Sequence, residues 1–214
     1  MRNTYILLMI IFLSSLAYSQ TIYDVEPGTS GNEIYLSLEN ISEGDLSSSL
    51  FVKEKSNSEF IEFTKNEVIL ENLKTSEIKD AYFKFDIKRD APVNELDTLK
   101  FLISNKNGYS ISKDIIVKYL PPSNFELEQN YPNPFNPSTK IRFQLPQNAK
   151  VTLKIYDILG SEVTTLINQN KTAGFHEVNW QAINYSSGTY IYQLIAEMET
   201  GVTKIDKKKM LLLK

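Results

Sequence analysis

Apolar and polar residues alternate one by one through most of the chain, whereas the three-to-four-residue spacing of an amphipathic helix is not found. In residues 81–88, Phe83, Phe85 and Ile87 fall on one side and charged residues fall on the other. Such a segment suits a sheet with one buried face. Further runs of this kind in the first half cover residues 34–39, 51–55, 60–63, 68–70, 98–104 and 111–119.

These runs predict about seven short strands separated by turns, which is typical of an immunoglobulin-like antiparallel β-sandwich. The Asn107-Gly108 pair between two of the runs suits a tight hairpin. The second half continues the pattern, and Gly160 and Gly174 stand where its chain would turn. We therefore predict an all-β protein made of two small sandwiches. The runs of the second half cover residues 140–145, 151–155, 162–167, 176–180, 189–197 and 202–213.

A proline-rich segment separates the two halves. Residues 120–124 read Leu-Pro-Pro-Ser-Asn, and two prolines in succession cannot continue a central strand because each lacks a donor for the ladder. We predict a stiff linker at residues 120–124, between a first domain at residues 20–119 and a second at residues 125–214.

The amino terminus has the three parts of a secretory signal peptide. A basic start at Arg2 precedes apolar residues 5–16, and the small residues Ala17 and Ser19 follow. We expect cleavage between Ser19 and Gln20; the alternatives are a buried amino-terminal strand or a retained membrane anchor. No later apolar segment is long enough to span a bilayer as a helix.

Composition limits the available chemistry. The sequence has no cysteine, which excludes disulfides, thiol catalysis and cysteine-based zinc sites. The single histidine, His176, lies in the second half, so the first domain has no imidazole for a Ser-His-Asp arrangement, and we expect His176 to be a sheet residue that shares a side with Val178 and Trp180. Residues 20–120 carry 18 acidic and 12 basic residues, which argues against nucleic acid as a ligand of this half.

Acidic residues offer two candidate sites in the first domain. Asp90, Glu95 and Asp97 gather around Pro92, but a calcium site needs about six oxygen ligands, so a solvated loop is the simpler interpretation. A carboxylate-based hydrolase would need two acids facing one cleft. The candidates for that pair are Glu62 and Glu67.

The second half contains a series of short motifs in a fixed order. It opens with a stiff loop in which prolines alternate with asparagine, and it ends in a lysine-rich strand. The residues that we single out are Tyr131, Pro132, Asn133, Pro134, Phe135, Gly160, Gly188, Tyr190, Lys207, Lys208, Lys209 and Lys214.

These motifs, from about residue 125 to residue 214, resemble the type A carboxy-terminal sorting domain of the bacterial type IX secretion system. The resemblance implies that the chain crosses the inner membrane, folds in the periplasm and passes the outer membrane because the translocon reads this domain. It also implies either attachment to surface lipopolysaccharide after trimming or release. No reaction and no cofactor belong to such a domain. A fold-level likeness to flagellar hook-capping proteins is the competing interpretation, although such proteins would not need the leader.

The role of the first domain follows less directly. We expect a non-enzymatic surface or secreted module that binds a protein or a glycan, or acts as a spacer; the alternatives are a small carboxylate-dependent hydrolase and a periplasmic hook-cap-like protein. Asp97-Thr98-Leu99 also resembles a short O-glycosylation acceptor of bacteria that use type IX secretion, which makes Thr98 a candidate for modification.

Overall fold

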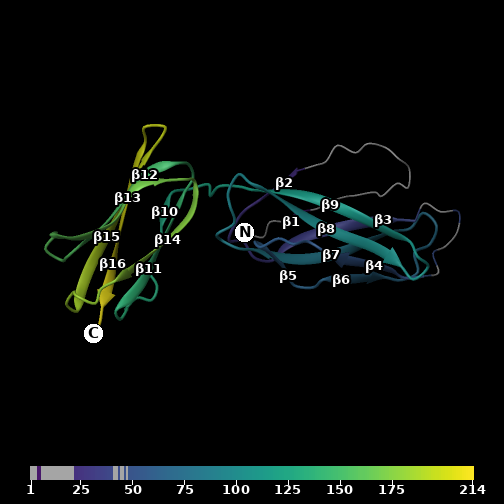
Figure 1. Cartoon of the computed structure of the whole chain (residues 1–214), viewed down its shortest axis with the longest axis horizontal. Coiled ribbons are helices and arrows are strands. Elements are labelled where there is room, and N and C mark those ends of the chain that lie inside the picture. The colour runs from purple at the N-terminus through teal and green to yellow at the C-terminus, as the bar shows by residue number, and fades with distance from the viewer. Residues whose placement is uncertain (1–3, 6–21, 41–42, 44–45, 47) are drawn as a thin grey trace. The chain divides into compact units, whose positions relative to one another are not determined.

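The computed structural model describes residues 4–5, 22–40, 43, 46 and 48–214. Every regular element in these ranges is a β-strand, so the all-β prediction is confirmed. The expected cleavage residues Ser19 and Gln20 lie outside the described residues. The chain divides into two compact units, Met1–Leu120 and Pro121–Lys214, which are described separately below (Figure 1).

The first unit contains two sheets. One has the order β1 (Thr4–Tyr5), β3 (Asn32–Glu39), β7 (Ile78–Ile87) and β5 (Ile61–Phe63). The other has the order β2 (Ile22–Val25), β9 (Ser110–Tyr119), β8 (Leu96–Asn105), β4 (Leu50–Glu54) and β6 (Glu67–Leu70). The β1–β3 and β2–β9 pairs are parallel, and the other pairs of this unit are antiparallel.

The core of the first unit consists of the apolar side of each alternating strand. Phe83 and Phe85 of β7 are buried, and Phe101 of β8 meets Phe83 with ring centroids 5.1 Å apart. Phe63 of β5 approaches Phe101 edge to face at 5.9 Å. Burial of each such ring contributes about 1.5–3 kcal/mol. The cluster explains how a cysteine-free unit of this size is held together.

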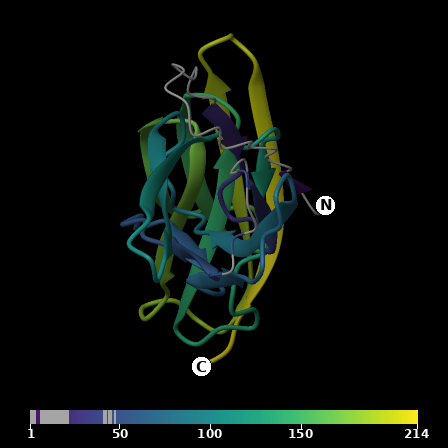
Figure 2. The same cartoon turned by 90° about the vertical axis from the view of Figure 1, so that its right-hand side faces the viewer.

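The second unit also contains two sheets, and its strand pairs are antiparallel. The smaller sheet has the order β10 (Glu126–Leu127), β11 (Ser138–Leu145) and β14 (Gly174–Gln181). The larger has the order β13 (Glu162–Lys171), β12 (Ala149–Tyr156), β15 (Gly188–Met198) and β16 (Thr203–Leu212). β16 is the long edge strand that leads to the carboxy terminus (Figure 2).

Trp180 lies at the centre of the aromatic contacts in the second unit. This residue of β14 is 3% exposed, and its ring lies 5.4 Å from the ring of Phe135 and 5.4 Å from that of Tyr190. Phe135 belongs to the loop before β11, and Tyr190 belongs to β15 in the other sheet. The indole therefore joins the two sheets and the loop before β11.

Candidate functional site

Four chain segments meet at one end of the second unit. The antiparallel register pairs Ser138 with Gln181 in the smaller sheet and Gly188 with Leu212 in the larger one. It thereby places the loop before β11, the loop between β14 and β15, and the end of β16 at the same end of their sheets. The β12–β13 turn joins them, because Tyr156 pairs with Ile191 near the start of β15. We call this end of the second unit the tip.

The loop at residues 129–137 is anchored by a buried polar network. The Asn130 side chain is buried, and its Nδ2 donates to Thr139 Oγ1 at 2.9 Å and to the carbonyl of Pro132 at 3.0 Å. The Tyr192 hydroxyl accepts from the Asn130 backbone N–H at 2.9 Å and donates to the carbonyl of Glu128 at 2.7 Å. Buried polar groups must be paired in this way, because an unpaired one costs about 1–3 kcal/mol.

The same loop is bonded to the end of β16. Asn133 Oδ1 accepts from the backbone N–H of Leu211 at 2.9 Å. The backbone N–H of Phe135 donates to the carbonyl of Leu211 at 2.9 Å, and the carbonyl of Phe135 accepts from the backbone N–H of Leu213 at 3.0 Å. Gln129 Nε2 donates to the carbonyl of Lys209 at 2.8 Å. The proline-rich motif and the carboxy-terminal residues, which are about 80 positions apart in the sequence, therefore form one piece of structure.

Large apolar side chains are exposed at the tip. Tyr131 is 75% exposed, and Ile158 and Leu159 of the β12–β13 turn are 74% and 87% exposed. The turn itself is fixed: Asp157 Oδ1 accepts two backbone N–H groups at 2.9 Å, and Gly160 has a φ of +85°, which favours glycine. Apolar residues held in solvent on a rigid turn indicate an interaction surface, since they contribute nothing to the core.

The predicted motif residues separate into two roles at this end of the unit. Tyr131 and Gly160 belong to the exposed tip. Phe135 is 2% exposed, and the buried Tyr190 donates its hydroxyl to the carbonyl of Ser186 at 2.8 Å. Lys214 donates its backbone N–H to Ser187 Oγ at 3.0 Å. Some motif residues are therefore buried and hold the tip together, and others are exposed on its surface.

Lys207, Lys208 and Lys209 do not form a single basic tail. They occupy successive positions of β16, so strand alternation sends Lys207 and Lys209 to the outer face of the sheet and Lys208 to the opposite side. The register confirms this separation, since Lys209 pairs with half-buried Ile191, whereas Lys208 pairs with buried Tyr192.

Asn130, Thr139 and Tyr192 are site residues that sequence reasoning missed. Asn130 and Thr139 are buried polar residues, and Tyr192 is fully buried. Tyr192 lies 62 positions from Asn130, so the partnership is not readable from local spacing. The available signal was the position of Asn130, directly before the motif at Tyr131.

His176 is a structural residue of the smaller sheet. Its ring stacks on Phe143 with centroids 5.1 Å apart, and its Nε2 lies 2.9 Å from the carbonyl oxygen of Thr172. Partial burial lowers the pKa of the imidazole, which favours the neutral form. His176, Val178 and Trp180 oppose alternate residues of β11, as expected for one side of a strand.

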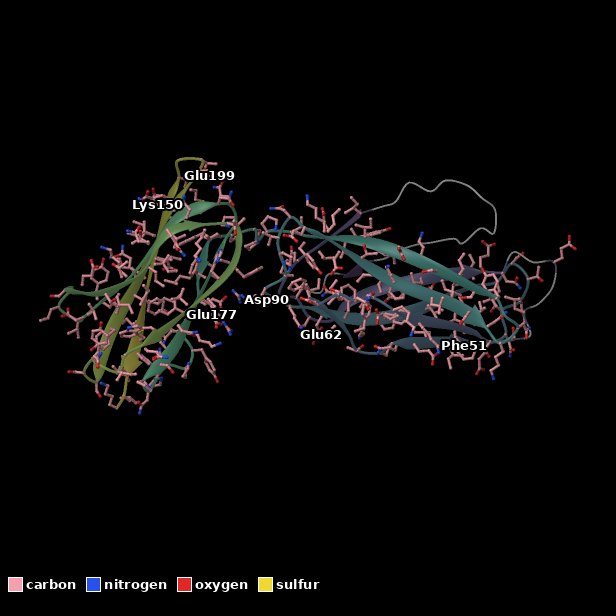
Figure 3. The ribbon with its side chains drawn as sticks, viewed as in Figure 1. Phe51, Glu62, Asp90, Lys150, Glu177 and Glu199 are labelled. Atoms are coloured by element: carbon pink, nitrogen blue, oxygen red, sulfur yellow. The ribbon has the colours of Figure 1, made fainter. Side chains whose placement is uncertain are left out.

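The acids weighed as a calcium site in the first unit, where a solvated loop is the simpler expectation, have other partners or lie in solvent. Asp97 Oδ2 accepts the hydroxyl of Tyr119 at 2.6 Å and also that of Ser58, so this carboxylate fastens the end of β9 and the loop before β5 to β8. Burial, followed by the hydrogen bond to Asp97, raises the pKa of Tyr119. Asp90 and Glu95 are exposed (Figure 3 labels Asp90). Within the described ranges, no three His, Asp or Glu residues are arranged to hold a metal ion.

Glu62 and Glu67 belong to different sheets of the first unit. Glu62 of β5 is paired with Lys88 at 3.0 Å, and Glu67 of β6 is paired with Lys53 at 3.1 Å (Figure 3 labels Glu62). The structure therefore gives each acid its own lysine and brings neither to the other. Thr98 is half-buried on β8, where it pairs with Ile116.

The fold and the tip define a class: a small all-β domain that exposes large apolar side chains at one end. Comparison shows that residues 129–208 match the model of the secretion system C-terminal sorting domain. The resemblance seen in the sequence is thereby confirmed for these residues. Such a domain marks the chain as a substrate of type IX secretion, implies interaction with the machinery of that system and implies export to the cell surface or release.

No curated protein matches the chain. Three solved structures give weak likenesses. Dimeric latent PorU from Porphyromonas gingivalis is 14% identical with a TM-score of 0.36, and the match covers 94% of this chain and 20% of that chain. The E. coli chaperone DraB is 15% identical with a TM-score of 0.32 and coverage of 98% of both chains, and CopC from Methylosinus trichosporium OB3b is 16% identical with a TM-score of 0.31 and coverage of 42% of this chain and 93% of that chain. This chain thus spans about a fifth of the PorU chain. At TM-scores below 0.5 these likenesses carry no further argument. In the described part of the chain, no helix has the length and apolar character needed to cross a membrane.

The Tyr192→Phe variant tests the anchor of the loop. Loss of the hydroxyl leaves the buried Asn130 N–H without its acceptor, so we expect the free energy of unfolding of the second unit to fall by about 2 kcal/mol. Urea unfolding followed by Trp180 fluorescence measures it, since this is the one tryptophan of the chain. Tyr190→Phe is the matched control, with an expected loss of about 1 kcal/mol or less, because its hydroxyl is only partly buried. Equal losses would contradict the anchoring role.

The Tyr192 hydroxyl also predicts a response to alkaline pH. Burial raises its pKa to about 12, whereas the pKa of an unfolded tyrosine is about 10. The folded unit disfavours the phenolate, so this contribution to stability is complete below pH 10 and is lost between about pH 10 and about pH 12, at about 1.4 kcal/mol per pH unit. We expect the pH dependence of the unfolding free energy in this window to be shallower for Tyr192→Phe than for the unmodified chain; parallel curves would disprove the assignment.

Proposed function

We propose that this chain is an exported, non-enzymatic protein whose first unit is delivered outside the cell and whose second unit is the sorting signal. The observation that carries the proposal is the match of residues 129–208 to the sorting-domain family. In this proposal residues 1–19 are a leader that is removed after Ser19, and the chain folds in the periplasm before it crosses the outer membrane. Attachment to surface lipopolysaccharide or release into the medium follows.

We further propose that the secretion machinery contacts the tip. Tyr131, Ile158 and Leu159 expose large apolar surface there. The backbone of Tyr131 is bonded to Lys140, and the Asp157 carboxylate fixes the turn. A rigid apolar surface loses little conformational entropy on binding, which favours recognition.

The first unit is proposed to bind a protein or a glycan, or to act as a spacer. Support comes from its acids: Glu62 and Glu67 are each neutralised by a lysine on separate sheets, and Asp97 is occupied by Tyr119. The histidine of the chain belongs to the second unit. These arrangements favour a structural or binding role over acid–base chemistry.

Deletion of residues 125–214 tests the sorting role of the second unit. We expect the truncated protein to remain in the periplasm, whereas the full chain appears at the cell surface or in the medium, as measured by fractionation of the native host with an antibody to the first unit. The full chain should also be retained in a strain that lacks type IX translocation. Appearance of the truncated form outside the cell would refute the proposal.

The Leu159→Asp variant tests the tip. Leu159 is 87% exposed, so the substitution should change the unfolding free energy by about 0.5 kcal/mol or less. A buried carboxylate at an apolar contact is costly, and we expect at least a tenfold lower rate of secretion, measured by pulse-labelling. Val202→Asp is the matched control because Val202 is 47% exposed in the β15–β16 hairpin at the other end of the unit. An equal loss in both variants would exclude the tip as the contact.

A further inference from the structure

The outer face of β15 and β16 carries aliphatic and basic side chains side by side. The register places Ile195 opposite Ile205 and Ile191 opposite Lys209, while Lys207 lies between these two pairs. Cross-strand neighbours of this kind are about 5 Å apart. We call this surface the basic–aliphatic face. It carries Ile191, Ile195, Ile205, Leu211, Lys207 and Lys209, and the same side also has Gln193 opposite Lys207, Thr189 opposite Leu211 and the exposed Glu197 opposite Thr203.

The aliphatic residues of this face are not part of the core. Ile205 is 56% exposed, and Ile191, Ile195 and Leu211 are half-buried. The core positions of the same strands are the alternate ones, such as Leu194 and Met210, which are 0% and 1% exposed. Four aliphatic side chains on the solvent side of a sheet remain unexplained by packing within the unit.

The lysines of the face lack acidic partners. Lys207 and Lys209 are exposed, and neither forms an ion pair with any residue that the structure describes. Lys154, which lies on the neighbouring strand β12, is neutralised by Glu162 at 2.7 Å. Lysines on an edge strand can guard against aggregation. That role does not explain why aliphatic residues surround these two.

The outer face of the smaller sheet provides a contrast within the same unit. There Lys140 and Arg142 are both bound to Glu177, at 2.6 Å and 2.8 Å (Figure 3 labels Glu177). That face is an ion-paired surface, as expected of a solvated sheet. The basic–aliphatic face differs in having both unpaired cations and exposed aliphatic carbons.

We infer that the basic–aliphatic face docks on an anionic lipid surface. The ammonium groups of Lys207 and Lys209 would bind lipid phosphates, and Ile191, Ile195, Ile205 and Leu211 would enter the boundary between headgroups and acyl chains. Interfacial binding needs this combination of apolar area and positive charge on one flat side, and the lysine stems let the charges stay at headgroup level. This role is separate from the tip and does not depend on recognition by the secretion machinery.

Vesicle binding tests the inference directly. The chain from Gln20 is sedimented with vesicles of phosphatidylcholine alone and of phosphatidylcholine with about one-third phosphatidylglycerol, at about 50 mM and about 500 mM salt. We expect binding to the anionic vesicles at low salt, strong loss at high salt and no binding to the neutral vesicles. Failure to bind the anionic vesicles, or equal binding to both kinds, would overturn the inference.

The β16 strand supplies its own control for the variants. Lys207→Gln combined with Lys209→Gln should weaken binding about 25-fold, at roughly fivefold for each lysine, and Ile205→Ser should weaken it without removing charge. Lys208→Gln, on the opposite side of the strand, should weaken it less than about twofold. If Lys208→Gln weakened vesicle binding as much as a single Lys207→Gln substitution, binding would depend only on net charge, and the docking face would be refuted.

Two further readouts exclude other occupants. Inorganic phosphate at millimolar concentration should not compete with the vesicles; full competition would mean a site for the free anion. Sedimentation of the chain without vesicles should give the same mass for the unmodified chain and for Ile205→Ser, since a mass that falls with the substitution would assign the face to a second copy. Trp180 fluorescence verifies that each variant is folded.

Discussion

The hydrogen bonds between the loop at residues 129–137 and the rest of the second unit are the constraint on which its functional end depends. Tyr192 holds the backbone of Asn130 from one sheet, and Asn133 and Phe135 hold the end of β16. A loop rich in proline has few backbone donors of its own, so the remaining ones and the side-chain amides must be satisfied from outside. The loop at residues 129–137 is therefore ordered by partners that are distant in sequence, whereas the β12–β13 turn that carries Ile158 and Leu159 is fixed locally by Asp157.

Strand alternation is the second constraint, and it explains why neighbours in the sequence differ in role. Lys207 and Lys209 share a solvent-facing side, whereas Lys208 opposes Tyr192 on the other side. The same rule places Leu194 in the core between half-buried Gln193 and Ile195. A sequence motif that lies in a strand therefore presents half of its residues on one face of the sheet and the other half on the opposite face.

The sequence predicted the class of fold well, because burial of one side of each strand is a local property that the alternation of Phe83, Phe85 and Ile87 records directly. It also identified the stretch of the sorting domain, since its motifs are contiguous. It could not reveal that Tyr192 caps Asn130, because this partnership depends on the register between sheets. For the same reason, spacing alone could not show that Glu62 and Glu67 lie on separate sheets, each beside its own lysine.

The hydrogen bonds between residues 211–214 and the loop at residues 129–137 affect how a partner could recognise the second unit. Leu211 and Leu213 supply backbone bonds to Phe135, and Lys214 bonds to Ser187 beside the tip. These bonds exist only when the final strand has been synthesised and has paired with β15. A partner that recognises the loop at residues 129–137 therefore contacts a surface that β16 holds in place. Recognition of this loop would therefore favour chains in which β16 has paired with β15.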